Sequence, residues 1–200
     1  MPATEPSRSP LTGRTIRLTP LTVDDAEELH PVVANPANYA DGYGMARPTT
    51  TVDETRAFIE ARMQASPGHL AFVGRLLTTG AVVGTSSIGD VDTKHETAHV
   101  GWTMWDQPHW GSAVNPDAKR LMLGHLFDDC GFERVLIQTD AINHHSQAAI
   151  AKLGATREGV LRHHLIRADG TRRDTVIFSI LRDEWPDTRA RLDARLNREQ

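Results

Sequence analysis

The chain has 200 residues, of which 39% are hydrophobic and 24% charged, and its formal net charge is −4. This composition describes one globular domain with a sizeable core, and the acidic balance disfavours a nucleic-acid-binding surface. The single cysteine, Cys130, excludes an internal disulfide framework and a cysteine-based zinc cluster. No apolar run is long enough to span a membrane, so we expect a cytoplasmic protein with neither nucleic acid nor a membrane as its partner.

The N-terminal half is predicted to alternate between strands and capped helices. Residues 1–12 are expected to be a disordered lead-in, because prolines and serines cluster there. We assign residues 13–200 to one domain that ends in a C-terminal helix. Its first strand is predicted at 15–19, where polar and apolar side chains alternate. A capped helix follows Thr22, and a second helix follows a loop at 35–51 that is rich in proline, glycine and asparagine.

Three residues are candidates for binding a substrate. Tyr39 and Tyr43 are the only tyrosines of the chain, and both lie in the loop at 35–51. Loops carry functional residues disproportionately, although tyrosines at such positions also cover the edge of a core. Arg162 could bind an acidic group of a substrate. The alternative that we favour for this arginine is an ion pair across the last hairpin with the neighbourhood of Asp174.

The rest of the chain predicts a mixed sheet with flanking helices. Three antiparallel strands are expected first, then a helix, a buried strand, a short helix and two hairpin strands, with predicted bounds 70–77, 81–88, 97–105, 116–130, 134–139, 143–153, 155–166 and 171–181. A helical crossover between strands 97–105 and 134–139 makes that pair parallel. The expected fold class is therefore α/β (α+β) with a mostly antiparallel central sheet.

The most distinctive stretch is the turn at 110–119, which lies inside this crossover. Small residues precede an amphipathic helix, with Asn115 predicted as its N-cap and Pro116 as its first helical residue. Backbone N–H groups and the helix dipole make such a turn a ready site for an anion. A turn that merely opens a helix would have the same sequence features.

Five short motifs, in the order in which the elements follow one another, carry a family resemblance. They are Trp110-Gly111-Ser112, Asn143-His144-His145-Ser146, Lys152-Leu153-Gly154-Ala155, Glu158-Gly159-Val160-Leu161-Arg162 and Arg173-Asp174. Over roughly residues 11–192 the chain resembles the GNAT superfamily of acyl-CoA-dependent N-acyltransferases. Within it, the chain looks like the branch of ribosomal-protein-alanine acetyltransferases. The resemblance implies the GNAT fold, in which the parallel pair of strands splays apart.

The resemblance also implies the residues that bind acetyl-CoA. The pantetheine arm would contact Trp102, Thr103 and Met104, and the pyrophosphate would lie on Trp110, Gly111, Ser112, Ala113, Val114 and Asn115. Asn143 would bond the pantetheine, or cap the helix that follows it. Lys119 could supply positive charge, which matters because Asp117 near the helix start would repel phosphate unless it points away. The family motif has Arg or Gln three positions before its first glycine, whereas this chain has Pro108 there.

Two residues are candidates for proton transfer. Ser146 is the candidate for protonating the departing thiolate, because the tyrosine that many relatives use for this step is Ile150 here. His99 is the first candidate for the general base, since it occupies a strand position where relatives often carry glutamate and its intrinsic pKa suits proton relay. We expect its side chain to point to the opposite sheet face from Trp102. Rival bases are Glu96, His163, His164 and Asp174.

These observations predict an acetyl-CoA-dependent N-acetyltransferase that acts on a primary amine by direct attack in a ternary complex, without a metal. The acceptor is a protein N-terminus or a small-molecule amine, and neither the acyl length nor the oligomeric state is fixed by the sequence, although homodimers are common among relatives. The alternative is a non-catalytic acyl-CoA-binding or interaction module on the same fold, which the absent tyrosine favours.

Overall fold

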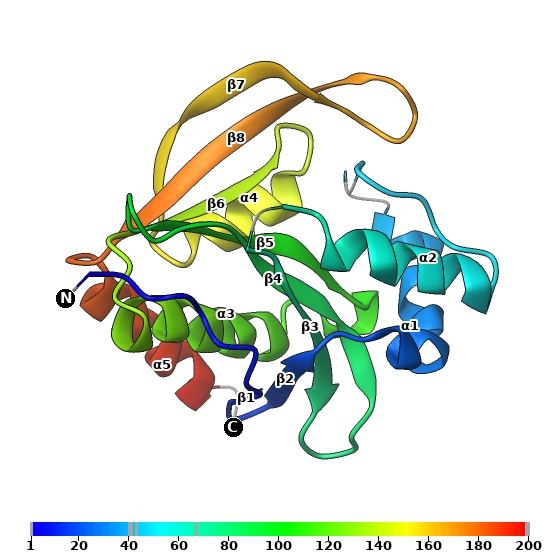
Figure 1. The fold of residues 1–200 in the computed structure, drawn as a ribbon, viewed down its shortest axis with the longest axis horizontal. Helices are drawn as coiled ribbons and strands as arrows, with labels where there is room; N and C mark the ends of the chain where they lie inside the picture. Colours follow the sequence, from blue (N-terminus) through cyan, green and yellow to red (C-terminus); the bar gives the residue numbers. More distant parts are fainter. Residues whose placement is uncertain (1, 40–41, 43, 67, 199–200) are drawn as a thin grey trace.

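The protein folds around a single sheet of eight strands, as the computed structural model in Figure 1 shows; the structure describes residues 2–39, 42, 44–66 and 68–198. The strand order is β1-β2-β3-β4-β5-β6-β8-β7. The strands are β1 (Leu11–Thr12), β2 (Ile16–Pro20), β3 (Leu70–Leu76), β4 (Val82–Asp92), β5 (Thr97–Trp105), β6 (Arg134–Asp140), β7 (Thr156–Ile166) and β8 (Arg172–Leu181). Only β5 and β6 pair in parallel among these strands, which confirms the predicted fold class.

Helices cover both faces of this sheet. They are α1 (Ala26–Val33), α2 (Val52–Met63), α3 (Val114–Gly124), α4 (His144–Ala151) and α5 (Trp185–Arg198). One core cluster joins α1 and α2 to alternate residues of β3, such as Ala71 and Val73. The larger cluster joins α3 and α5 to the other β3 residues, such as Phe72. Because successive strand residues point to opposite faces, this alternation places a hydrophobic layer on each side of the sheet.

The helices α2 and α3 begin in different ways. Thr51 caps α2, since its hydroxyl accepts a hydrogen bond from the Glu54 N–H at 3.1 Å. The prediction for α3 is wrong: the helix begins at Val114, so Asn115 lies inside its first turn and Pro116 is its third residue. The reason is a long-range contact. Asn115 Oδ1 accepts from the indole Nε1 of Trp105 at 3.0 Å, so the side chain is not available as a cap.

The N-terminal segment is bound to the body rather than disordered, contrary to the prediction for residues 1–12. It runs along α3 (Figure 1). The N–H of Thr4 donates to the Cys130 carbonyl at 2.9 Å, and the N–H of Ser7 donates to His125 Nε2 at 3.1 Å. Pro6 is buried, and the segment ends in the short strand β1, which the sequence did not reveal. A strand of two residues is too short to show a periodic pattern.

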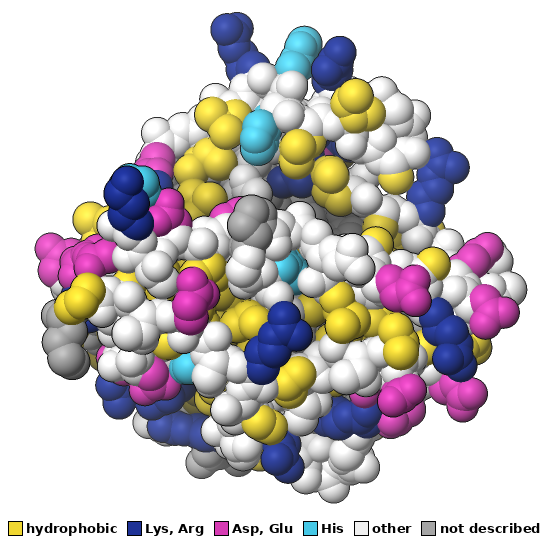
Figure 2. Space-filling view, in the orientation of Figure 1, with side chains coloured by type: hydrophobic (Ala, Val, Ile, Leu, Met, Phe, Trp, Pro, Cys, Tyr) yellow, Lys and Arg dark blue, Asp and Glu magenta, His cyan; other side chains and the backbone are white. Residues whose placement is uncertain are grey.

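The hairpin of β7 and β8 is the most exposed part of the sheet. It projects from the body in Figure 1, and hydrophobic side chains gather on it in Figure 2. Val160, Leu161 and Ile166 are exposed on β7, which is the edge strand. Gly170 has a φ of +87°, which lies in the left-handed region that the hairpin turn at Asp169-Gly170 requires. Among the described helices, none combines the length and apolar character needed to cross a bilayer.

A buried carboxylate joins α3 to the start of the sheet. The side chain of Asp117 is fully buried, and its Oδ2 accepts hydrogen bonds from the N–H groups of Arg14, Thr15 and Ile16, at 2.7, 2.7 and 3.2 Å. Gly13 packs so closely on this carboxylate that no side chain would fit there. Asp117 therefore points toward β2 and away from the turn that precedes α3.

Replacing Asp117 by alanine is expected to destabilise the protein by about 3 kcal/mol, because three backbone N–H groups, of which that of Ile16 is buried, lose a charged acceptor. Asp117→Asn keeps an acceptor and should cost about 1 kcal/mol. Urea unfolding measures both values. The matched control is Asp53→Ala, whose side chain is 97% exposed and which should change stability by less than about 0.5 kcal/mol. An Asp117→Ala variant as stable as that control would contradict the assigned role.

Candidate active site

A deep cleft opens where the two parallel strands separate. β5 and β6 pair only through Thr97, Ala98 and His99, opposite residues 134–136, and then diverge. Beyond that point β5 is bonded to β4 alone and β6 to β8 alone. The cleft between them has a volume of about 730 Å³. Because the ladder stops, the edges of both strands that face the cleft keep backbone groups without a partner strand.

A β-bulge shapes the β5 side of the cleft. Thr85 is opposite Met104 and Ser87 is opposite Gly101, so Trp102 and Thr103 together face the single residue Ser86. Trp102 has a φ of +49°, in the left-handed region that costs a residue other than glycine about 1–2 kcal/mol. Backbone strain of this kind is retained where the surroundings enforce it. In this protein the bulge takes Trp102 and Thr103, which both line the cleft, out of regular strand geometry.

The turn before α3 forms one end of the cleft, lined by Trp110, Gly111, Ser112 and Asn115. Gly111 has a φ of +78°, and open space surrounds the point where a Cβ would lie. Within the described chain, the N–H groups of Gly111 and Ala113 donate to no acceptor. The Trp110 indole donates to the Trp105 carbonyl at 2.8 Å and thereby holds the turn. Free donors at a helix N-terminus are suited to bind an anion.

Helix α4 forms the opposite wall. Asn143 caps it, because Asn143 Oδ1 accepts from the N–H of Ser146 at 2.8 Å, and both residues line the cleft. The hydroxyl of Ser146 has no hydrogen-bond partner among the described residues. His145 and Trp110 approach each other across the cleft, with ring centroids 4.8 Å apart. The turn before α3 and the start of α4 are thus in contact through these two rings. Ser146, the residue after His145, also lines the cleft.

His99 lies at the point where the strands part. Its Nδ1 donates to Asp90 Oδ2 at 3.2 Å, which leaves the lone pair on Nε2; that atom is buried and has no partner among the described residues. A methyl group at Gly101 would lie 2.5 Å from Nε2, so glycine is needed there. Burial lowers the pKa of His99, and Asp90 partly offsets this. The histidine is therefore neutral near pH 7 and is able to accept a proton.

The expected orientation of His99 relative to Trp102 is wrong. The two rings are in contact, with centroids 4.5 Å apart, and the indole also meets His69 edge-on at 4.6 Å. Simple alternation would place residues 99 and 102 on opposite faces. The bulge at Trp102 breaks the alternation and brings its side chain onto the face of His99.

Lys119 lies on the floor of the cleft and is only 5% exposed. Its Nζ donates to Thr103 Oγ1 at 2.8 Å, and that hydroxyl is 2.7 Å from Ser86 Oγ. No carboxylate lies within ion-pair distance of Nζ in the described part of the chain. Burial lowers the pKa of Lys119 to about 7.

The end of the cleft away from the α3 turn is closed by the β7–β8 hairpin and the loop before α2. Arg167 binds the buried carboxylate of Asp140 through two bonds of 2.6 and 2.8 Å. Arg173 Nε lies 3.9 Å from the same carboxylate. The N–H of Ala168 donates to the Gly44 carbonyl at 2.9 Å, which ties the hairpin tip to the loop. The ion pairs of Asp140 with Arg167 and Arg173 thus hold the β7–β8 hairpin over this end of the cleft.

Most predicted site residues line the cleft. They are His99, Trp102, Thr103, Met104, Trp110, Gly111, Ser112, Asn115, Lys119, Asn143 and Ser146. The side chain of Val114 is instead in the core, and Ala113 contributes its N–H beside the cleft. Of the rival bases, His164 lines the cleft, whereas Glu96, His163 and Asp174 do not.

The predicted substrate-binding residues are placed differently. The Tyr39 hydroxyl donates to the Val33 carbonyl at 2.8 Å, and the ring packs on a core cluster rather than lining the cleft. Tyr43 lies outside the described residues. Arg162 is exposed on β7 outside the cleft, and the ion pair that we favoured is wrong. Asp174 accepts from the N–H of His163 at 2.7 Å instead, because a bulge at His163, with φ of +51°, turns that N–H toward it.

Sequence reasoning assigned no site role to six charged residues that line the cleft, namely Arg62, Asp90, Asp140, Lys152, Arg173 and Arg195. Asp90 was expected in a turn, but β4 continues to Asp92 and carries it alongside His99. Arg195 belongs to the C-terminal helix and donates to the Gly111 carbonyl at 3.2 Å. Neither residue belongs to a local motif, so only the packing of distant segments brings them to the site.

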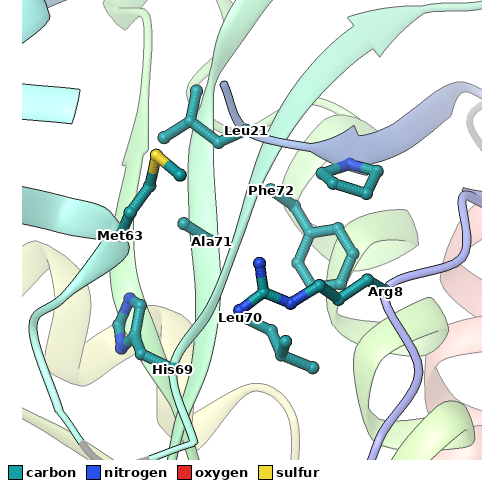
Figure 3. A pocket seen from close by; sticks show the side chains of 8 residues that line it. Arg8, Leu21, Met63, His69, Leu70, Ala71 and Phe72 are labelled. Atoms are coloured by element: carbon teal, nitrogen blue, oxygen red, sulfur yellow. The ribbon is translucent and has the colours of Figure 1, made fainter. Parts of the chain in front are cut away.

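A second pocket is too small for a substrate. It lies between the N-terminal segment and β3, lined by residues that include Arg8, Met63 and His69 (Figure 3). Its volume of about 20 Å³ is room for about one water molecule. The large cleft is therefore the candidate active site.

Comparison with known proteins gives consistent matches over most of the chain. The family model described as "Acetyltransferase (GNAT) domain" matches residues 15–156. YjcK of Bacillus subtilis (strain 168), named a probable N-acetyltransferase, is 24% identical over 176 residues, which are 86% of this chain and 96% of YjcK. YoaA of the same organism, named an uncharacterized N-acetyltransferase, is 26% identical over 104 residues, so the match spans 52% of this chain and 58% of YoaA.

Two solved structures extend the comparison to the whole fold. A T. thermophilus protein classed as an acetyltransferase has a TM-score of 0.84 and 35% identity, covering 94% of this chain and 97% of that chain. Mycobacterium smegmatis RimJ in complex with CoA-disulfide has a TM-score of 0.75 and 22% identity, covering 93% and 92%. The second likeness is one of fold alone.

Proposed function

The chain belongs to the GNAT acetyltransferase family, and from this premise we propose that it transfers an acetyl group from acetyl-CoA to a primary amine by direct attack in a ternary complex. The observation that carries the proposal is the cleft between β5 and β6, which combines a neutral base with backbone donors and a hydroxyl that have no partner among the described residues. We also propose membership of the branch of ribosomal-protein acetyltransferases, which the fold of M. smegmatis RimJ supports.

The cleft fits acetyl-CoA in its shape and its donors. The unpaired edge of β5 at residues 102–104 is suited to the amides of the pantetheine arm, because an open strand edge bonds extended amide groups as a further strand would. The N–H groups of Gly111 and Ala113, with the α3 dipole, suit the pyrophosphate. Arg195 adds positive charge at this turn, and Asp117 is turned away from it. When bound, the thioester supplies the activated acetyl group.

Proton transfer is assigned to His99 and Ser146. An alkylamine must be neutral to attack, and its ordinary pKa is near 10.4, so a base must take up its proton directly or through water. His99 is neutral and is oriented by Asp90, which fixes the lone pair on Nε2. Ser146 has a free hydroxyl at the start of α4 and donates a proton to the departing thiolate. No covalent acyl-enzyme on Cys130 is required, since that thiol is buried outside the cleft.

The acceptor would enter from the end roofed by the β7–β8 hairpin, where the cleft is lined by α2 and by the loop that precedes it. A protein N-terminus and a small-molecule amine both meet the chemical requirement. A non-catalytic acyl-CoA-binding module is the second candidate function. The observation that favours it is Ile150. This buried side chain occupies the position at which many relatives carry a tyrosine that protonates the departing thiolate.

Acetyl-CoA is expected to raise the melting temperature, because a ligand that binds only the folded state at about 100 times its Kd adds about 2.7 kcal/mol. Differential scanning fluorimetry measures the shift. Release of free thiol with a panel of amines then measures transfer. Binding without thiol release across N-terminal peptides, polyamines and amino sugars would favour the module, and the absence of any thermal shift would refute both functions.

Ser146→Ala is expected to lower kcat about 100-fold while the KM for acetyl-CoA changes less than about twofold, because the hydroxyl acts on the leaving thiolate. Steady-state kinetics with the best amine of the panel measures the two constants. Ser9→Ala, at an exposed position of the N-terminal segment, is the matched control. An unchanged kcat for Ser146→Ala would remove this serine from the mechanism.

His99→Gln is expected to lower kcat/KM about 100-fold near pH 7. The ratio of the wild-type kcat/KM to that of the variant should become smaller at acid pH. Burial lowers the pKa of His99 below its ordinary value of 6.5, so wild-type His99 becomes protonated, and useless as a base, only below that value. Rate measurements across pH give the ratio of wild type to variant. His95→Gln, with a side chain 66% exposed, is the control; a ratio independent of pH would contradict the role of His99 as base.

A further inference from the structure

The chain contains three lysines, and one of them differs from the others in its surroundings. Lys94 and Lys152 are exposed, although Lys152 also lines the cleft, whereas Lys119 is 5% exposed on the cleft floor. Removing an ammonium group from water costs several kcal/mol unless a counter-charge compensates. No Asp or Glu of the described chain lies within 4.0 Å of the Lys119 amine. The fold therefore buries the Lys119 amine without placing a carboxylate of the described chain at ion-pair distance.

The hydrogen bonds of Lys119 leave its lone pair unused. Nζ donates to Thr103 Oγ1 at 2.8 Å. The Thr103 and Ser86 hydroxyls are hydrogen-bonded to each other at 2.7 Å, and each lies 3.4 Å from the Gly101 carbonyl. An ammonium group would need acceptors for all three of its protons. Burial lowers the pKa of Lys119 to about 7, so much of it is neutral near neutral pH. An exposed lysine would be neutral in about one molecule in a thousand.

The amine of Lys119 is hydrogen-bonded to β5 and not to the turn before α3, which is proposed to bind phosphate. Thr103 follows the bulged residue Trp102 on the β5 edge that is proposed to hold the pantetheine arm. The proposed base His99 lies further back on the same strand, where β5 and β6 part. Lys119 thus lies beneath the β5 edge, between the turn and the proposed base.

We propose that Lys119 is a site of self-acetylation, modified by acetyl-CoA bound in the same cleft; this proposal rests on the proposed function. The lone pair of Nζ attacks the acetyl carbonyl carbon, so that a C–N bond forms and the C–S bond breaks with its electrons on sulfur. The proton lost by nitrogen passes to that sulfur, directly or through water. Coenzyme A leaves as the thiol, and Lys119 becomes a neutral acetamide.

The test is incubation of the purified protein with acetyl-CoA labelled in the acetyl group, without an amine acceptor, followed by mass spectrometry of the intact chain and its peptides. The expected result is one acetyl group per chain on Lys119, added at least about tenfold faster than at Lys94, since a nucleophile held beside its reactant gains a large effective concentration. Excess coenzyme A should suppress this labelling. Acetyl phosphate, which does not resemble coenzyme A, should label Lys94 ahead of Lys119.

Two variants sharpen the result. Lys119→Arg should remove the label from that peptide, and Lys94→Arg, which changes an exposed residue outside the cleft, should leave labelling of Lys119 unchanged within about twofold. Melting temperatures with acetyl-CoA are measured on the same samples. A thermal shift without acetylation of Lys119 would overturn this proposal and leave the proposed function intact. The absence of both shift and label would overturn both.

Discussion

The separation of β5 from β6 is the feature on which the rest of the site depends. A parallel ladder satisfies one backbone donor or acceptor after another, and this one stops after three residues. The unpaired groups beyond that point would be costly in a closed core, so they are kept where a ligand or water is able to reach them. The bulge at Trp102, the turn before α3 and the cap of α4 are each placed relative to this break.

Buried ionisable groups gather around the same break. Burial favours the uncharged forms of both His99 and Lys119, on adjoining parts of the cleft. An interior selected for stability alone would replace such groups by apolar side chains, since burying them gains little. Their concentration beside the open strands supports a chemical role for the cleft. Asp117 is the contrasting case, because its Oδ2 joins α3 to residues 14–16 through three hydrogen bonds.

The two ends of the cleft are formed by different kinds of structural element. The α3 turn presents backbone N–H groups held by Trp105 and Trp110, which suits a ligand part that does not vary. The other end is enclosed by a projecting hairpin and a loop, which are joined by the hydrogen bond from the Ala168 N–H to the Gly44 carbonyl, while Arg167 ties the hairpin to Asp140 of β6. Loops and hairpin tips change readily while the sheet stays the same. This division accounts for a fixed chemistry of the acyl donor alongside an acceptor that the fold does not specify.

The sequence by itself determined the fold class, the parallel crossover and a subset of the residues that line the cleft, because these depend on local periodicity, on turn residues such as Asp169-Gly170 and on short motifs. It failed where distant segments decide the outcome. Asn115 does not cap α3 because Trp105 takes its oxygen, and Trp102 lies against His99 because the bulge rotates it. Only the tertiary structure buried Lys119 and turned Asp117 inward. Burial and long-range hydrogen bonds join residues far apart in the chain, such as Asp117 and Arg14 at a separation of 103 positions, and no local pattern records them.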